Sequence, residues 1–149
     1  MKIKIEKMII DDLENIKDVL ISDFDDFWNY NVLKTELLNE TSYYIVAKNP
    51  ENIIVGFAGV QFILDEASIT NIVARKIYRH QGIGTLLLKN IILISKQKNM
   101  SSITLEVNEN NSYALSLYNK LGFEKIGLRK KYYNGVDNAI IMRLSMVPG

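Results

Sequence analysis

Apolar residues in this chain fall into short alternating or continuous runs at some places and recur every three or four residues at others. The short runs, bounded by turn residues, predict about seven strands. These strands cover residues 2–7, 43–48, 53–64, 66–74, 102–107, 123–133 and 137–146. Within the third, Gly56 and Gly59 are expected to loosen the strand, because glycine adds no side chain to pack.

Helical spacing predicts about four helices between these strands. The first follows Asp11 and Asp12, which can cap it, and its apolar stripe is Leu13, Ile16, Val19 and Leu20. The others are a short helix around Leu33, Leu37 and Leu38, one over residues 84–98, and one over 111–121 that Gly122 ends. Strands and helices alternate in the middle of the chain and hairpins flank them, one around Asn134-Gly135. This order predicts an α/β fold, a mixed sheet with helices on both faces, in a single domain over residues 1–149.

The segment RHQGIGT, residues 79–85, stands between an apolar strand and an apolar helix. Two glycines one residue apart leave backbone N–H groups uncovered, and the first N–H groups of a helix have no partner within it. The helix dipole adds partial positive charge there, so the segment predicts a phosphate site. A P-loop needs four residues between its glycines and then Lys, and a dinucleotide fingerprint needs a third glycine where Leu87 stands. Both of those alternatives fail.

Composition narrows the possible chemistry. The 18 basic and 17 acidic residues nearly balance, which argues against nucleic acid as a partner. The chain has no cysteine and one histidine, His80, which excludes a cysteine nucleophile and makes a metal cluster implausible, so no metal is expected. Because we find neither a signal peptide nor a transmembrane run, we expect a cytoplasmic protein without membrane contact.

A second block specifies a family. Residues 105–133 read LEVNENNSYALSLYNKLGFEKIGLRKKYY, with seven positions on the family's spacing: Glu106, Asn111, Ala114, Leu117, Tyr118, Gly122 and Phe123. Together with R/Q-x-x-G-x-G/A in the loop, this resembles the GNAT superfamily of N-acetyltransferases, and within it the ribosomal-protein-alanine branch. The resemblance implies a GNAT-type fold: a mixed, mostly antiparallel central sheet of about seven strands, flanked by about four helices. It also implies acetyl-CoA as cosubstrate.

Three departures from the branch concern the acceptor and the loop. Asn108 stands where the branch often has Arg, Arg75-Lys76-Ile77 where it often has Pro, and Phe27-Trp28 where Pro-Trp is common. The first and third fall in regions that the resemblance assigns to the acceptor channel. They therefore bear on the identity of the acceptor more than on the chemistry.

The resemblance implies which residues bind the coenzyme. The diphosphate would lie on Arg79, His80, Gln81, Gly82, Ile83, Gly84 and Thr85, and the pantetheine arm on the backbone of Ile72, Val73 and Ala74. Asn111 is a further candidate for a coenzyme contact. It is an equally good N-cap for the helix that follows.

Two side chains are candidates for the chemistry. Alternation places Ile103, Leu105 and Val107 on one strand face and Glu106 on the other, toward a cleft or toward solvent. The resemblance makes Glu106 the general base and Tyr118 the donor of a proton to the departing thiolate. By spacing alone, Tyr118 is more consistent with a core tyrosine than with a catalytic one. An α-amine, with a pKa near 8, needs about 3 kcal/mol less than a lysine to be neutral at pH 7, which suits one carboxylate base.

The acceptor side is predicted from the same resemblance. Trp28, Tyr132 and Tyr133 would line the channel, with ordinary strand aromatics as the alternative for the two tyrosines. Asp23, Asp25 and Asp26 could attract a basic N-terminal tail, or be a solvated loop. The expected activity is direct acetyl transfer to a protein N-terminal α-amine, with a ribosomal protein as the implied partner. The alternatives are acetylation of a lysine or small-molecule amine, or a coenzyme-binding module without turnover.

Overall fold

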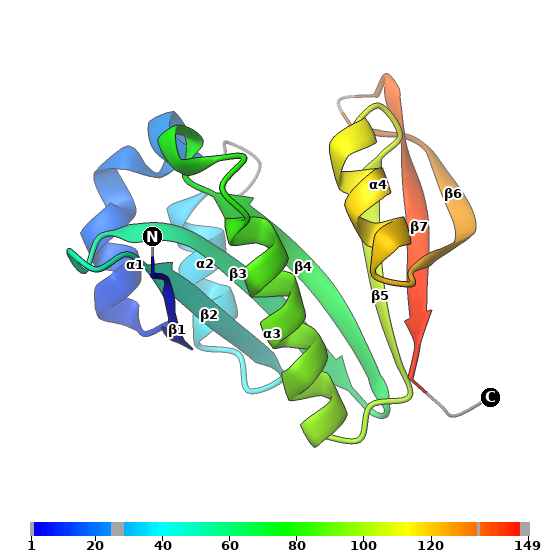
Figure 1. Cartoon of the computed structure of the whole chain (residues 1–149), viewed down its shortest axis with the longest axis horizontal. Coiled ribbons are helices and arrows are strands. Elements are labelled where there is room, and N and C mark those ends of the chain that lie inside the picture. The colour runs from blue at the N-terminus through cyan, green and yellow to red at the C-terminus, as the bar shows by residue number, and fades with distance from the viewer. Residues whose placement is uncertain (1, 25–28, 134, 147–149) are drawn as a thin grey trace.

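A seven-stranded sheet forms the centre of the computed structural model, which describes residues 2–24, 29–133 and 135–146 (Figure 1). The strand order is β1-β2-β3-β4-β5-β7-β6, and every neighbouring pair is antiparallel except β4 and β5. The strands are β1 Lys4–Lys7, β2 Ser42–Lys48, β3 Ile54–Ile63, β4 Glu66–Ala74, β5 Ser102–Asn108, β6 Glu124–Tyr133 and β7 Asp137–Ser145. The predicted mixed sheet is confirmed.

Two apolar cores cover the two faces of this sheet. The helices are α1 Ile10–Ile16, α2 Tyr30–Leu37, α3 Ile83–Gln97 and α4 Ser112–Lys120. Helices α3 and α4 pack on one face, where Leu87, Leu88 and Ile91 meet apolar strand residues. The region of α1 and α2 packs on the other face through residues such as Leu13 and Leu33. No helix in the described part of the chain is long and apolar enough to cross a membrane.

The first helix differs from its prediction at both ends. Asp12 lies inside the first turn and not at the cap position, and its Oδ2 accepts a hydrogen bond from the Ile9 N–H at 2.9 Å. The α-helix ends at Ile16, and the chain continues through a 3-10 turn, Lys17–Val19, and a π-helical turn, Leu20–Phe24. Spacing alone could not show this break, because Ile16, Leu20 and Phe24 all stay buried.

The two glycines of β3 tighten the packing rather than loosen it. A Cβ on Gly59 would lie 2.3 Å from the Tyr44 ring, and one on Gly56 would lie 2.8 Å from Ile83 Cγ2. The Tyr44 hydroxyl lies 3.3 Å from Thr70 Oγ1 and accepts from the Asn71 amide at 3.1 Å. The register of β3 against β4 shifts at this point, since Gly59 pairs with Asn71 and Val60 with Ile69. Thr70 is the extra residue of a β-bulge.

Beside this bulge, β4 and β5 separate. Their parallel ladder covers only Glu66–Ser68 against residues 102–104, and the ribbons then diverge (Figure 1). β4 stays paired with β3 up to Ala74, so the β5-facing edge of residues 69–74 is left without a strand partner. Bulges are frequent next to functional sites because they end or redirect pairing, and this one lies where the sheet opens.

Candidate active site

A cavity of about 410 Å³ lies along the end of β4, between the segment that opens α3 and the first turns of α4. Its lining is Ile72, Val73, Ala74, Arg79, His80, Gly82, Ile83, Gly84, Thr85, Asn111, Tyr113, Ala114, Leu117 and Tyr118. The structure therefore brings together ten of the eleven predicted coenzyme residues. Gln81 is exposed and is not part of the lining.

The start of α3 is shaped for an anion. Gly82 is the N-cap residue and has φ +81°, a left-handed conformation that glycine adopts without strain. Leu86 N–H bonds to the Gly82 carbonyl at 3.0 Å, so the N–H groups of residues 83–85 precede the first α-helical bond. A Cβ on Gly82 would meet nothing within 4 Å, and one on Gly84 only Ile72 Cγ2 at 4.0 Å. Donors and open space thus coincide where the sequence predicted a phosphate.

Arg79 contributes differently from what the motif suggests. Its guanidinium donates to the Ala74 carbonyl from Nε at 3.0 Å and to the Phe24 carbonyl from Nη2 at 2.8 Å. These bonds fasten the end of β4 to the π-helical turn. We therefore expect Arg79 to act on a bound diphosphate by fixing the loop.

The unpaired edge of β4 faces the same cavity. Val73 is buried on the α1 face, while Ile72 and Ala74 pack toward α3. Their backbone groups on the β5 side have no strand to pair with, which suits a ligand that carries amides. This arrangement fits the pantetheine arm of a coenzyme, and the assignment of Ile72, Val73 and Ala74 to it stays a prediction.

Helix α4 closes the cavity with Asn111 and Tyr118. The Asn111 Oδ1 accepts from the Ala114 N–H at 3.1 Å, so its N-cap role is confirmed. The Tyr118 ring lies 5.9 Å from the Phe123 ring, centroid to centroid. Burial, with a smaller effect of Tyr133, raises the pKa of Tyr118 to about 12, so the phenol keeps its proton at neutral pH. Tyr118 is therefore both packed and available as a proton donor.

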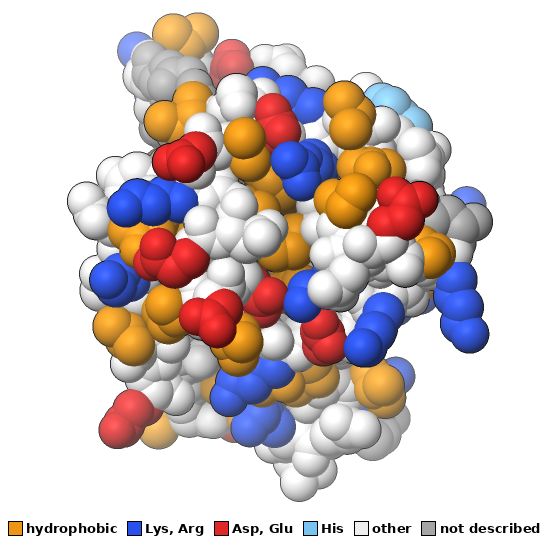
Figure 2. All heavy atoms as spheres, turned by 90° about the vertical axis from the view of Figure 1, so that its left-hand side faces the viewer, with side chains coloured by type: hydrophobic (Ala, Val, Ile, Leu, Met, Phe, Trp, Pro, Cys, Tyr) orange, Lys and Arg blue, Asp and Glu red, His pale blue; other side chains and the backbone are white. Residues whose placement is uncertain are grey.

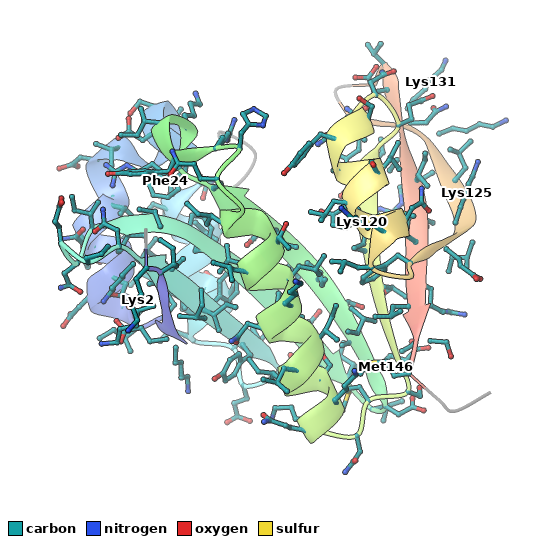
Figure 3. The ribbon with its side chains drawn as sticks, in the orientation of Figure 1. Lys2, Phe24, Lys120, Lys125, Lys131 and Met146 are labelled. Atoms are coloured by element: carbon teal, nitrogen blue, oxygen red, sulfur yellow. The ribbon has the colours of Figure 1, made fainter. Side chains whose placement is uncertain are left out.

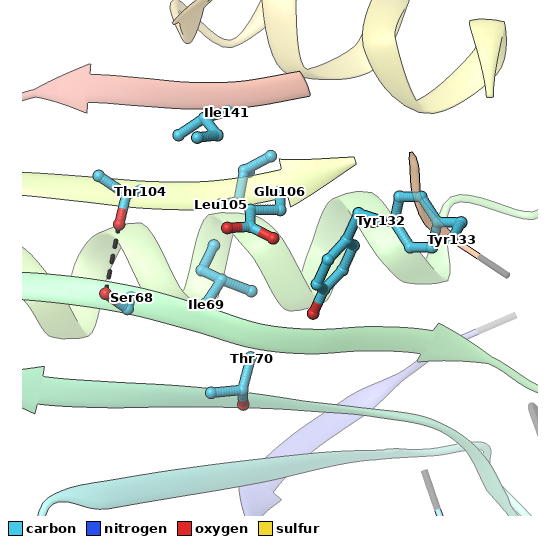
Figure 4. A pocket seen from close by; sticks show the side chains of 9 residues that line it. All are labelled: Ser68, Ile69, Thr70, Thr104, Leu105, Glu106, Tyr132, Tyr133 and Ile141. Atoms are coloured by element: carbon cyan, nitrogen blue, oxygen red, sulfur yellow. Dashed lines mark hydrogen bonds between the residues drawn. The ribbon is translucent and has the colours of Figure 1, made fainter. Parts of the chain in front are cut away.

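A second cavity, of about 270 Å³, contains Glu106 (Figure 4). Residues 68–70 of β4, residues 104–106 of β5, Tyr132, Tyr133 and Ile141 line it. Ile103, Leu105 and Val107 are buried in the core under α3, so Glu106 lies on the opposite face, as the alternation predicted. In Figure 4 the Glu106 carboxylate and the Tyr132 ring both occupy the space between β5 and β4.

Arg129 is a neighbour of Glu106 that the sequence prediction did not include. Its Nη2 lies 2.8 Å from Glu106 Oε1, and its guanidinium carbon lies 4.7 Å from the centre of the Tyr132 ring. The Glu106 side chain is 27% exposed and that of Arg129 53%. The sequence shows several basic residues before the tyrosine pair, which could have indicated a cation near the site. Only the strand register identifies Arg129 as the basic residue that reaches Glu106.

Tyr133 links the two cavities electrostatically. Burial raises the pKa of Tyr133, the Glu106 carboxylate raises it further, and Tyr133 in turn acts on Tyr118. The rings of Tyr132 and Tyr133 meet edge to face at 5.0 Å. Glu106 lies on the face of β5 opposite the α3-side core, while Tyr118 packs against that core, so the two candidate groups line separate cavities.

The remaining predicted acceptor residues are only partly within the structure. Trp28, Asp25 and Asp26 lie outside the described residues. Asp23 is engaged by Arg75 in an ion pair of 2.9 Å, and this bond lowers the pKa of the Asp23 carboxyl. Among the described residues, no three His, Asp or Glu side chains are grouped as a metal ion would require.

Known proteins share both the sequence pattern and the fold. The Acetyltransferase (GNAT) family model matches residues 8–123. A Haemophilus influenzae [ribosomal protein bS18]-alanine N-acetyltransferase is 40% identical over 120 residues, 77% of this chain and 80% of that protein. A Bacillus subtilis protein named as a candidate for the same activity is 33% identical over an alignment that covers 95% of this chain and 94% of the length of that protein.

A solved structure extends the likeness to three dimensions. The ribosomal-protein-S18-alanine N-acetyltransferase of Escherichia coli superposes with a TM-score of 0.89 at 27% identity, covering 99% of this chain and 96% of that one. The family match spans the phosphate-site loop, both strands that diverge and helix α4. The chain therefore belongs to the acetyltransferase (GNAT) family and is an acetyl-CoA-dependent N-acetyltransferase.

Proposed function

We propose that this enzyme acetylates the N-terminal α-amine of a protein that begins with alanine, and that a ribosomal protein of the bS18 type is its acceptor. The observation that carries the proposal is that two cavities lie along consecutive stretches of β4, where this strand separates from β5. One has the donors and the unpaired strand edge that suit a coenzyme, and the other has a carboxylate among tyrosines. The names of the relatives support the acceptor class.

The residues of the chain divide the proton transfers between them. Acetyl-CoA supplies the acetyl group as a thioester, whose C–S bond is exchanged for a C–N bond to the acceptor. Glu106 takes the proton that the amine loses as its nitrogen attacks the carbonyl carbon, directly or through one water. Tyr118 gives its phenolic proton to the sulfur that leaves. With no cysteine in the chain to carry an acyl group, the transfer is direct.

The Glu106 pocket suits an α-amine better than a lysine. It holds one carboxylate, and an N-terminal amine needs about 3 kcal/mol less than a lysine to lose its proton at neutral pH. The flanking Tyr132 and Tyr133 rings can cover the first residues of an extended peptide. A ribosomal acceptor would also locate the enzyme in the cytoplasm, which stays a prediction.

Acetylation of a peptide panel tests this function. Peptides that begin with Ala, Ser or Met, each with one internal lysine, are incubated with enzyme and acetyl-CoA beside small amines, and mass spectrometry locates the acetyl group. We expect the α-amine of the Ala peptides to be modified most rapidly, and Glu106→Gln to abolish most of that rate. Preferred modification of lysine or of a small amine would replace this acceptor class by the alternative one.

A further inference from the structure

Arg129 on β6 reaches Glu106, the candidate base on β5, across the strand that lies between them, β7. In the sheet, Glu106 pairs with Ile141 of β7, and Ile141 with Gly127 of β6. Arg129 lies two residues beyond Gly127, opposite the small Ala139, and its guanidinium crosses β7 to bond Glu106 at 2.8 Å.

The position of Arg129 is fixed by an irregularity in β6. The pairing of β6 with β7 breaks between Arg129 and Tyr133, and Lys131 within the break has φ +52°. The Lys131 N–H donates to Asn138 Oδ1 at 2.8 Å, which holds the bulged segment against β7. The Tyr132 ring, carried by the same segment, lies against the Arg129 guanidinium. Arg129 is thus held between a carboxylate and an aromatic ring.

A cation at this place changes which form of an amine the pocket accepts. An α-amine in water near neutral pH is mostly ammonium, which cannot attack a carbonyl carbon. An unpaired carboxylate would stabilise that ammonium, whereas a like charge nearby disfavours it. The Glu106–Arg129 pair offers the acceptor a basic oxygen with little net charge.

We propose that Arg129 is a positioning residue that orients the Glu106 carboxylate and, as a fixed positive charge beside the acceptor nitrogen, favours the neutral amine in the enzyme–substrate complex. This inference rests on the proposed function and deepens it. Arg129 bonds Glu106, so it orients this carboxylate by contact, while its charge acts on the acceptor amine without touching it.

The other charged and titratable groups around the pocket do not supply the same effect. From β6 come the phenols of Tyr132 and Tyr133, neither of which can carry a positive charge. From β7, Asp137 is bonded by the amides of Asn108 and Asn110, and Arg143 lies opposite Thr104, farther along the strand. Beyond β4, the Tyr44 phenol is buried and Glu36 of α2 acts on it. Among the described residues, Arg129 is the cation bonded to Glu106.

The pH dependence of the chemical step tests the proposal. The single-turnover rate of the acetyl-CoA-loaded enzyme is measured at saturating Ala-initiated peptide from about pH 6 to 9.5, a range that brackets the amine. We expect Arg129→Gln to move the ascending limb to higher pH by about 0.5 to 1 unit, since the complex then retains the ammonium more strongly. Arg129→Lys keeps the charge and should restore most of the wild-type profile, while the KM for acetyl-CoA stays unchanged.

Lys125→Gln is the matched control. Lys125 is on the same strand but pairs with Met142, which points to the α3 face, so its removal costs one positive charge on the other side of the sheet. Figure 3 shows Lys125 at the outer edge of β6. The pH profile of the single-turnover rate of Lys125→Gln should equal that of wild type. A uniform loss of rate in Arg129→Gln at every pH, or the same shift in Lys125→Gln, would overturn the proposal. A wild-type enzyme that acetylates no α-amine would instead refute the proposed function.

Discussion

Tyr118 is largely buried and yet forms part of a cavity wall. Its ring is packed against Phe123, and burial raises its pKa to about 12 while leaving the residue on the wall of the larger cavity. A phenol with a pKa of about 12 is a weaker acid than a thiol, whose pKa is about 8.5, so the transfer to a departing thiolate is uphill and requires the hydroxyl to lie close to the sulfur.

Replacement of Tyr118 by Phe removes the proton and keeps the ring. We expect kcat to fall by about 10²- to 10⁴-fold, the usual contribution of a general acid, with little change in the KM for acetyl-CoA. Initial-rate kinetics at varied acetyl-CoA measure both quantities. Turnover equal to that of wild type would exclude Tyr118 from the proton transfer.

Gly59 shows how one residue without a side chain supports the wall of the smaller pocket. An added Cβ would lie 2.3 Å from the Tyr44 ring and 2.7 Å from Thr70 Oγ1, so the ring and its bonds to Thr70 and Asn71 must shift. We expect Gly59→Ala to cost about 1–3 kcal/mol of unfolding free energy, the range for an overpacked core.

Thermal unfolding measures this cost. About 2–4 °C of melting temperature per kcal/mol is typical of chains of this size, so a loss of several degrees is expected. Gly84→Ala is the matched control, because its Cβ would meet only Ile72 Cγ2 at 4.0 Å. Equal melting temperatures for the two variants would show that the ring of Tyr44 is not held as described.

At the scale of elements, a substitution at the start of α3 should change the stability of the protein and its affinity for the coenzyme in opposite directions. Gly84 is inside the helix, and alanine there should raise stability by about 0.5–1 kcal/mol. The same methyl group projects beside the N–H groups that would hold the diphosphate. We therefore expect Gly84→Ala to unfold at an equal or higher temperature and yet to bind coenzyme A several-fold more weakly, as calorimetric titration would measure. Unchanged affinity would move the diphosphate away from α3.

The sequence was most informative where one regular pattern decides the structure. Alternation identified the face of Glu106, and helical spacing identified α3 and α4 with Asn111 as N-cap and Gly122, φ +98°, after the last turn. The sequence was least informative where contacts between segments distant along the chain determine the structure. Asp12 caps α1 from inside the helix while it also pairs with Lys48 of β2, and the Arg79 guanidinium is bonded to the carbonyls of Ala74 and Phe24.

Functional geometry in β4 and β6 also depends on irregularities that no local pattern encodes. The Thr70 bulge lies beside the contact of Tyr44 with Gly59, which joins residues on two other strands. The contact of Arg129 with Glu106 requires the register of three strands, in which Arg129 lies opposite the small Ala139. Motif spacing can identify a family's residues, but it cannot identify a partner that only pairing brings into reach.

At the scale of the whole molecule, the charge on the surface bears on how the acceptor protein is recognised. The face over α1 and β1 carries acidic and basic side chains side by side, without a large area of one sign (Figure 2). The described side chains on this face therefore form no broad field of one sign. We expect recognition of the acceptor to depend on the Glu106 pocket and its tyrosines, because these residues surround the candidate base.

The sheet consists of two parts that meet at a short seam. The β4–β5 ladder spans three residues on each strand, and near it Ser68 Oγ lies 3.2 Å from Thr104 Oγ1, while the Ser101 N–H donates to the Asp65 carbonyl at 2.6 Å. Beyond this seam the larger cavity separates residues 72–74 of β4 from α4. A ligand in that cavity touches both parts and should stabilise them together.

Coenzyme A at about 100 times its dissociation constant should add about 2.7 kcal/mol to the unfolding free energy and raise the melting temperature by about 5–10 °C. Hydrogen exchange should slow both in residues 69–74 of β4 and in α4, because the ligand contacts both sides of the opening. Pantetheine lacks the diphosphate that α3 would hold, so at the same concentration it should protect β4 less and leave the start of α3 unchanged. Protection confined to one side of the seam would mean that the coenzyme does not lie between β4 and α4, and the assignment of Tyr118 to its sulfur would then fail as well.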